Sequence, residues 1–117
     1  MTDDEKRRLA DSGVAVEEAL ERFMGQEDIY VSFLHRFLVD PTIAQLRSCV
    51  EEEQAAEGFE WAHTLKGVAA NLSLTGVLEV IAPMVETLRE GSLEGVAEQV
   101  QEFDSRCETL QKVIEQF

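Results

Sequence analysis

His63 is the residue of this chain whose neighbours could support group-transfer chemistry. It lies in a segment, about residues 55–72, whose apolar residues recur three and four apart, which predicts a helix. On a wheel with about 100° per residue, His63 falls roughly 160° from the middle of the apolar side. Lys66 and Gly67 follow it by three and four residues and therefore share its exposed face. The apolar side consists of Gly58, Trp61, Ala62, Leu65, Val68, Ala69 and Leu72.

The residue types beside the imidazole fit the transfer of a phosphoryl group. Neutral imidazole is a good nucleophile near pH 7. Gly67 costs about 1 kcal/mol relative to alanine inside a helix, so a glycine there indicates that another protein must come close to the ring. Lys66 is the only cation between Glu51 and Leu88, and an ammonium one turn away suits an anion held on His63. Phosphoryl transfer needs mainly in-line positioning and charge stabilisation, so a partner can supply the metal and the acceptor carboxylate.

Four further residues on or beside this face are candidates for partner docking. An exposed helical face normally carries long charged side chains, but here Phe59 leans outward and Ala70 is small. Glu60 lies one turn before the imidazole. Small apolar surroundings of this kind are typical of a docking patch. Asn71 is either a docking contact or an ordinary surface residue.

The rest of the chain is also helical in pattern, and strand-like alternation is absent. Asp40 and Pro41 have the types of an N-cap and a first helical residue. Pro83 lies inside an expected helix, where it should produce a kink. We expect helices over about residues 14–24, 28–39, 41–50, 55–72 and 74–89, with Tyr30, Phe33, Leu34 and Phe37 forming one inward stripe.

A final helix is expected after Gly91-Ser92. It carries apolar residues from Val96 to Phe117 at alternating spacings of four and three, which is typical of a helix in a bundle. The sequence therefore predicts an all-α fold, an antiparallel four-helix bundle with one or two short N-terminal helices. We expect residues 1–12 to be a charged N-terminal tail, either loose or a poorly anchored helix, and residues 13–117 to be the bundle domain.

Charge and composition narrow the class of protein. Twenty-four acidic against ten basic residues give a net charge of −14, which disfavours nucleic acid and anionic membranes as partners. No apolar run is long enough to span a bilayer, and the charged opening segment is unlike a signal peptide, so we expect a cytoplasmic protein. Two histidines and two cysteines scattered over four helices do not suggest a metal site. No phosphate-binding loop suggests an enzyme that uses nucleotides.

Residues 62–72, with the sequence AHTLKGVAANL, resemble the signature of histidine-containing phosphotransfer (Hpt) domains, roughly A-H-x-L-K-G-x-A-x-x-L-G. The chain departs from it at Ser73, where glycine is usual, so Ser73 should weaken the helix stop. Weaker similarity covers Glu27–Tyr30 with Phe33 and Phe37, and Leu88–Gly91.

The resemblance implies a phosphocarrier without kinase activity. His63 would be the phosphoacceptor through Nε2, Lys66 would steady the phosphoryl group, and Gly67 would give the partner access. The partner would be the aspartate-bearing receiver domain of a response regulator or a hybrid sensor kinase in a two-component phosphorelay. Mg²⁺ would belong to that receiver, so we expect a monomer with no cofactor of its own.

Two other functions compete with this hypothesis. A helical adaptor would use the patch of Phe59, Gly67 and Ala70 for binding alone, without phosphorylation of His63. A metal- or haem-binding bundle would use His63 as an axial ligand, but a histidine opposite the core is poorly placed for that role. The remaining residues of note are expected to be structural: His35, Cys49, Cys107 and Trp61.

Overall fold

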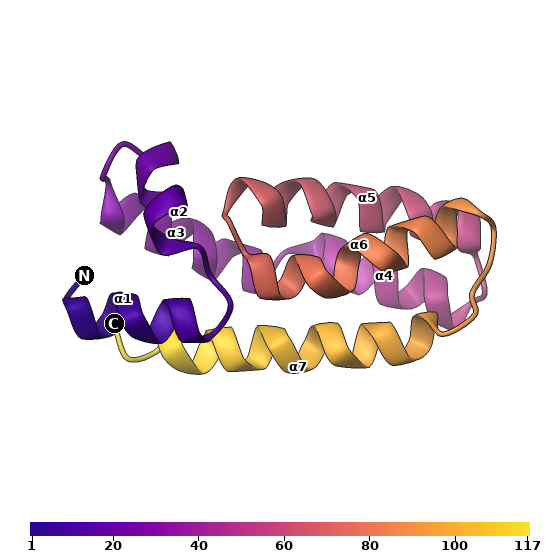
Figure 1. Ribbon diagram of the computed structural model, residues 1–117. Helices are drawn as coiled ribbons and strands as arrows, with labels where there is room; N and C mark the ends of the chain where they lie inside the picture. The colour runs from indigo at the N-terminus through magenta and orange to yellow at the C-terminus, as the bar shows by residue number, and fades with distance from the viewer.

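The computed structural model describes residues 1–117 and contains seven helices and no strands. They are α1 (Asp3–Asp11), α2 (Val16–Arg22), α3 (Glu27–Leu38), α4 (Pro41–Glu51), α5 (Ala55–Asn71), α6 (Thr75–Arg89) and α7 (Val96–Ile114). The last four lie side by side as a bundle, and α1, α2 and α3 lie toward the end of it where both termini are found (Figure 1). The elongated molecule measures 43 × 23 × 20 Å. The predicted all-α four-helix bundle with short N-terminal helices is confirmed.

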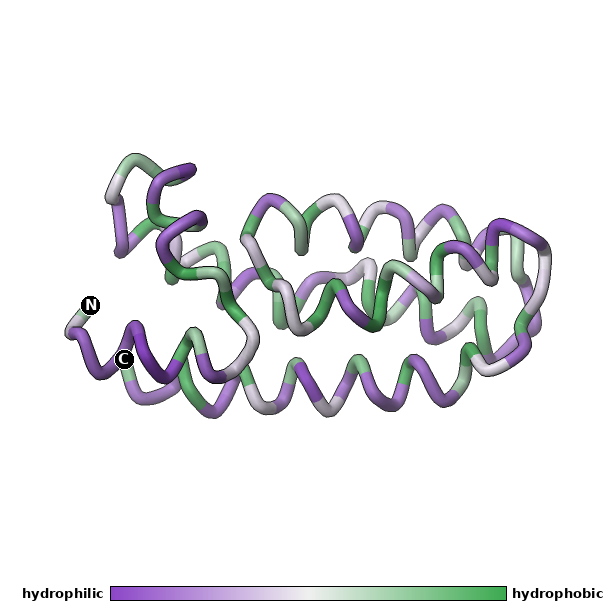
Figure 2. Tube along the Cα trace, viewed as in Figure 1, coloured by the Kyte–Doolittle hydropathy of each residue, from purple (hydrophilic) through white to green (hydrophobic).

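The apolar faces of the helices form one continuous core, which appears as inward-facing green segments in Figure 2. Helix α5 packs between α4 and α6, and α7 closes the bundle against α6, α4 and α3. Each large apolar side chain buried in this way contributes about 1.5–3 kcal/mol. On α5, the predicted inward residues are buried at Gly58, Ala62, Leu65, Ala69 and Leu72, and half-buried at Trp61 and Val68. Burial of this side fixes the opposite side of α5, including His63, toward solvent.

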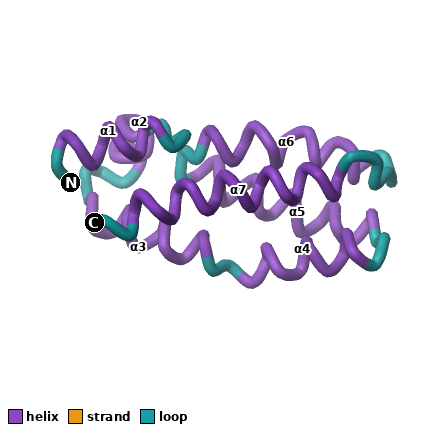
Figure 3. Tube along the Cα trace, turned by 90° about the horizontal axis from the view of Figure 1, so that it is seen from below, coloured by secondary structure: helices purple, strands orange, loops and turns teal.

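Helix α4 begins as the residue types predict. The Asp40 carboxylate accepts a hydrogen bond from the Thr42 amide at 2.8 Å, and Pro41 occupies the first turn, where its missing N–H is not needed. A short loop at Val39 and Asp40 therefore separates α3 from α4 (Figure 3).

Ser73 follows the end of α5 at the position where the Hpt signature has glycine, and the helix ends there with serine in place of glycine. Its backbone is left-handed, with φ of 56°, a conformation that glycine adopts more easily. The buried Ser73 hydroxyl accepts a hydrogen bond from Arg22 at 2.8 Å and donates one to Glu18 at 3.2 Å. Arg22 also donates to the carbonyl oxygens of Ala70 and Asn71 at 3.1 and 2.9 Å; the Ala70 carbonyl already accepts from the Ser73 amide, so the acceptor that Arg22 alone satisfies is the Asn71 carbonyl. Contacts from α2 thus stabilise the stop that glycine would otherwise provide.

The first twelve residues are not a loose tail. Thr2 and Glu5 form a capping box that starts α1, and the Leu9 side chain is fully buried. Helix α1 packs against α2 and the C-terminal part of α7. The charged residues of α1 lie on its outer face. The overall charge of the segment therefore gave no indication that Leu9 would be buried and hold α1 in place.

Two smaller expectations also differ from the structure. Phe33 is 39% exposed, whereas Tyr30, Leu34 and Phe37 are buried as predicted. Helix α7 begins at Val96 with Gly95 in a left-handed conformation, rather than directly after Ser92. Pro83 lies inside the continuous helix α6, as expected, and the kink at Pro83 stays a prediction.

Candidate functional site

The imidazole of His63 is exposed near the middle of α5. No hydrogen bond or ion pair within the protein occupies either ring nitrogen. The helical wheel predicted this orientation from the apolar side of α5. In the structure that apolar side packs against α4 and α6, so His63 on the opposite side faces solvent. The nitrogen lone pair is therefore available to a group that arrives from outside the molecule.

Gly67 leaves open space one turn beyond His63. A Cβ atom at Gly67 would meet no heavy atom within 4 Å, and the residue is exposed. The other glycine of α5 differs, since a Cβ at Gly58 would lie 3.5 Å from the Cys49 Cβ and 3.6 Å from the Leu88 side chain. A Cβ at Gly58 would therefore be in ordinary van der Waals contact with the core, whereas a Cβ at Gly67 would face open space. The surface beside Gly67 is therefore open to solvent.

Lys66 lies between His63 and Gly67 in the sequence, and it is half-buried. None of the nine ion pairs of the protein includes it. Side chains on a helix point back toward its N-terminus, so the Lys66 stem extends over the turn that carries His63. An ammonium without a partner carboxylate, in a chain of charge −14, is free to pair with an incoming anion.

The aromatic ring of Phe59 lies on the other side of the imidazole. The two ring centroids are 5.7 Å apart, with planes tilted by 32°. The guanidinium carbon of Arg89, at the end of α6, lies 4.8 Å from the centroid of the Phe59 ring. Arg89 also pairs through Nε with the Glu86 carboxylate at 3.3 Å. A second cation therefore stands close to the His63 face.

The sequence does not reveal that Arg89 lies near His63, because Arg89 is 26 residues further along the chain, just beyond the stretch from Glu51 to Leu88 in which Lys66 is the only cation. Because α5 and α6 are neighbouring antiparallel helices, the end of α6 meets the beginning of α5, where Phe59 lies. A search of the next helix for a cation at that level could have found it.

The four candidate docking residues differ in how far they are exposed to solvent. Glu60, Ala70 and Asn71 are exposed, and Phe59 is half-buried between His63 and Arg89. Beyond Asn71 the surface continues into a groove of about 380 Å³, which we call the α3–α5 groove. Its lining is Phe23, Phe33, Arg36, Phe37, Asp40, Val68, Asn71 and Leu72.

The exposed Phe33 forms one wall of the α3–α5 groove. Its ring lies 5.5 Å from that of Phe23, and the Arg36 guanidinium carbon lies 5.2 Å from its centroid. The sequence interpretation placed Phe33 in the core because its spacing fits the inward stripe. The apolar surface near His63 is therefore larger than the sequence indicated.

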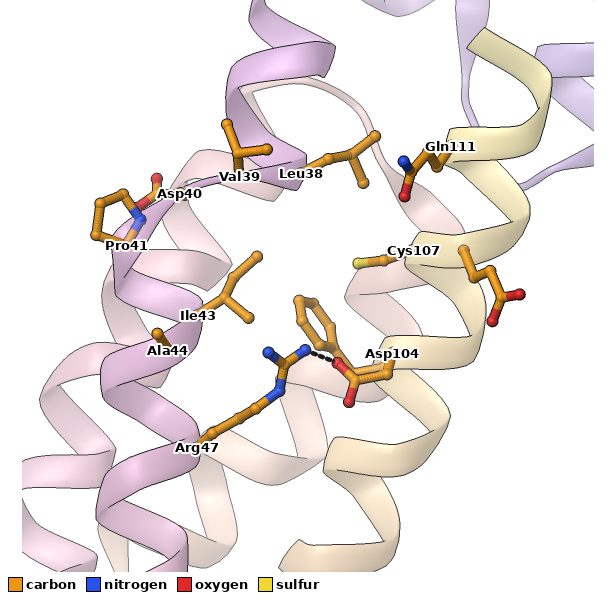
Figure 4. A pocket seen from close by; sticks show the side chains of 12 residues that line it. Leu38, Val39, Asp40, Pro41, Ile43, Ala44, Arg47, Asp104, Cys107 and Gln111 are labelled. Carbon is orange, nitrogen blue, oxygen red and sulfur yellow. Dashed lines mark hydrogen bonds and ion pairs between the residues drawn. The ribbon is translucent and has the colours of Figure 1, made fainter. Parts of the chain in front are cut away.

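A second hollow, of about 360 Å³, lies at the seam between α4 and α7 (Figure 4). Arg47 and Asp104 form an ion pair across it, and no residue of α5 lines it. Cys107 points into this hollow and is half-buried, whereas Cys49 is buried as predicted. Burial, and secondarily Asp104, raises the pKa of the Cys107 thiol to about 12, so the thiol stays protonated and weakly nucleophilic. His35 is exposed on α3 rather than packed among its apolar neighbours.

Comparison with known proteins gives one match. The model of the Hpt domain family matches residues 38–113, which include His63, Lys66 and Gly67. Comparisons with curated proteins and with solved structures gave no match. The matched residues are most of the chain and include the four bundle helices α4, α5, α6 and nearly all of α7. The chain belongs to the Hpt domain family.

Hpt domains in general are helical-bundle phosphocarriers of phosphorelays, without kinase activity, and they interact with receiver domains and kinases. The match begins at Leu38, so the assignment of residues 13–37 to the same domain stays a prediction. None of the seven helices is both long and apolar enough to cross a lipid bilayer.

Proposed function

We propose that this protein relays a phosphoryl group between the aspartates of receiver domains, with His63 as the phosphoacceptor. The observation that carries the proposal is the exposed imidazole of His63 beside the open backbone of Gly67, in a chain of the Hpt family. An exposed nucleophile with clearance one turn away suits a reaction in which the donor is itself carried by a protein.

The transfer needs little from the bundle beyond position and charge. The lone pair of His63 Nε2 attacks the phosphorus of the receiver's aspartyl phosphate, so an N–P bond forms as the P–O bond to the aspartate breaks. The aspartate leaves as a carboxylate with the bonding electrons, and the proton on the other ring nitrogen stays on the imidazole. The second transfer reverses these steps on another receiver. The transition state is loose and highly charged, so Lys66 would stabilise its oxygens.

The partner supplies the remaining components in this proposal. The receiver holds the Mg²⁺ ion and the aspartate, and the present protein acts as a cytoplasmic monomer with no cofactor and no kinase activity of its own. Its docking surface runs from Phe59 and Glu60 past His63 to Ala70 and Asn71, and on into the α3–α5 groove.

The test is incubation of the wild-type protein with a receiver domain from the same source that carries a labelled aspartyl phosphate. We expect label on this protein that is lost in acid and retained in base, the behaviour of a phosphoramidate. A receiver that binds this protein without transferring any label would support the helical adaptor instead.

Replacing Lys66 with alanine is expected to slow transfer by a factor between about 1.4 and 5 without abolishing it, because one partly exposed charge contributes about 0.2–1 kcal/mol. The measurement is the initial rate of label transfer from the receiver. Lys112→Ala is the matched control, since it removes an exposed lysine of α7 that pairs with Glu108 and changes the net charge equally. Equal rates for the two variants would exclude the proposed role of Lys66, and complete loss in Lys66→Ala would mean that its role is larger than a screened charge.

Replacing Phe33 with serine is expected to raise the KM for the receiver about tenfold and to leave kcat little changed, because the groove would contribute to binding and not to the chemical step. Ile29→Ser is the matched control, because Ile29 is 46% exposed on the same helix but does not line the groove. Steady-state transfer over a range of receiver concentrations separates the two constants. A KM that changes equally in both variants would argue against docking at the groove.

A further inference from the structure

We infer that Phe59 and Arg89 are positioning residues that hold the imidazole of His63 in one orientation; the inference rests on the proposed role of His63 as phosphoacceptor. Neither residue touches the reacting atoms. Phe59 contacts the imidazole, and Arg89 acts through Phe59.

Phe59 limits the movement of the imidazole from the N-terminal side. The two residues are four apart on α5, and helical side chains point toward the N-terminus, so the imidazole extends over the turn that carries Phe59. The tilted arrangement, with centroids 5.7 Å apart and planes at 32°, lies within the distance range of favourable contacts between aromatic rings. This contact restricts the side-chain torsions of His63 while its ring nitrogens remain free at the edge. An exposed histidine without such a neighbour would exchange among several rotamers.

Arg89 keeps the Phe59 ring in place from a different helix. Its guanidinium carbon lies 4.8 Å from the ring centroid, within the range of cation–π attraction. Its Nε also pairs with Glu86 one turn earlier on α6, which limits the freedom of the guanidinium itself. Because α6 packs closely against α5, the restraint on Phe59 does not depend on α5 alone. The chain of contacts from Glu86 through Arg89 and Phe59 ends at His63.

Restraint of the imidazole matters because transfer requires the attacking nitrogen to lie in line with the bond that breaks. If Phe59 were shortened, His63 would remain exposed and nucleophilic but would occupy the productive orientation for a smaller fraction of the time. The rate constant at saturating receiver would fall while the bundle stays folded, because a saturating concentration of receiver removes the contribution of Phe59 to docking from this readout.

The experiment compares Phe59→Leu, Phe59→Tyr, Arg89→Gln and Arg89→Lys with the wild type, with urea denaturation to show that each variant is folded. One readout is independent of any partner: the NMR chemical shifts of the His63 ring protons, which an adjacent aromatic ring displaces. The exposed His35 provides the reference for a histidine without such a neighbour. The other readout is the rate constant of label transfer at saturating receiver.

In Phe59→Leu we expect the His63 shifts to move toward those of His35 and the rate constant to fall about tenfold. Phe59→Tyr should keep both properties, because the ring is retained. Arg89→Gln should give a smaller loss of both, and Arg89→Lys should restore most of it, because an ammonium also binds an aromatic face. Arg47→Gln is the matched control, since it removes an exposed arginine at the seam between α4 and α7 and should change neither readout.

Wild-type shifts and a wild-type rate in Phe59→Leu would overturn the inference. An equal loss of rate in Phe59→Tyr and Phe59→Leu would also overturn it, because the ring would then not be the cause. If the wild type accepts no label, the proposed function fails, but the His63 shifts still decide whether Phe59 and Arg89 position the imidazole.

Discussion

Replacing His63 with glutamine is expected to abolish the acid-labile label that the protein takes from a phosphorylated receiver. The glutamine amide has no nucleophilic lone pair on nitrogen, so no N–P bond can form at position 63. His63 is exposed and makes no hydrogen bond within the bundle, and glutamine is a better helix former than histidine. The loss of label should therefore occur in a protein of unchanged stability. The measurement is the label retained after a fixed time of incubation, with urea denaturation as the check on folding.

His35→Gln is the matched control for this variant. His35 is the other histidine of the chain, is also exposed, and lies on α3 outside the α3–α5 groove. We expect it to be labelled as fast as the wild type. Retention of label in His63→Gln would show that another residue is the phosphoacceptor, and a loss in His35→Gln as well would mean that the assay does not report on a single histidine.

Replacing Gly67 with glutamine is expected to slow transfer about a hundredfold, because a long side chain would occupy the space through which the receiver approaches the imidazole. The same change should leave the free energy of unfolding unchanged or raise it by up to about 1 kcal/mol, because glycine is a poor residue inside a helix. No atom of the bundle lies within 4 Å of the position of the new Cβ, so no internal clash opposes this gain. Slower transfer together with an unchanged or higher free energy of unfolding would show that the added side chain blocks access and does not damage the fold. The measurements are the rate of label transfer and urea denaturation.

Ala97→Gln is the matched control for Gly67→Gln. Ala97 is exposed near the beginning of α7, where the same long side chain projects into solvent away from α5. It should change the transfer rate little. A large loss of stability in Gly67→Gln without any defect in transfer would contradict the clearance argument.

The sequence predicted those parts of the fold that depend on neighbours along the chain. The wheel of α5 separated His63 from Leu65 and Ala69 correctly, because helical periodicity alone decides which side of α5 is apolar. The cap at Asp40 followed in the same way from two adjacent residues. Both properties depend only on residues close together in the chain, so a single sequence is enough to predict them.

The parts that could not be predicted depend on contacts between distant segments. Phe33 has the spacing of a core residue, but the neighbouring helices do not cover it, and it forms a groove wall instead. Arg89 on α6 contacts Phe59 on the neighbouring helix α5. Leu9 is buried in the core where α1 packs against α7, the last helix of the chain. Ser73 adopts a glycine-like backbone because Arg22 and Glu18 bind its hydroxyl. In each case the chemical type of the residue was known but its partner was not.

The contacts of Arg22 with the end of α5 also bear on the smallest part of the chain that can fold independently. The family match starts at Leu38, yet the carbonyl oxygens of Ala70 and Asn71 and the Ser73 hydroxyl are bonded by Arg22, and the Leu72 carbonyl accepts a 2.6 Å hydrogen bond from Tyr30. A fragment trimmed to the matched residues would leave the Asn71 and Leu72 carbonyls and the left-handed Ser73 without these contacts. We therefore expect the smallest fragment that folds independently to begin before Leu38 and to include α2.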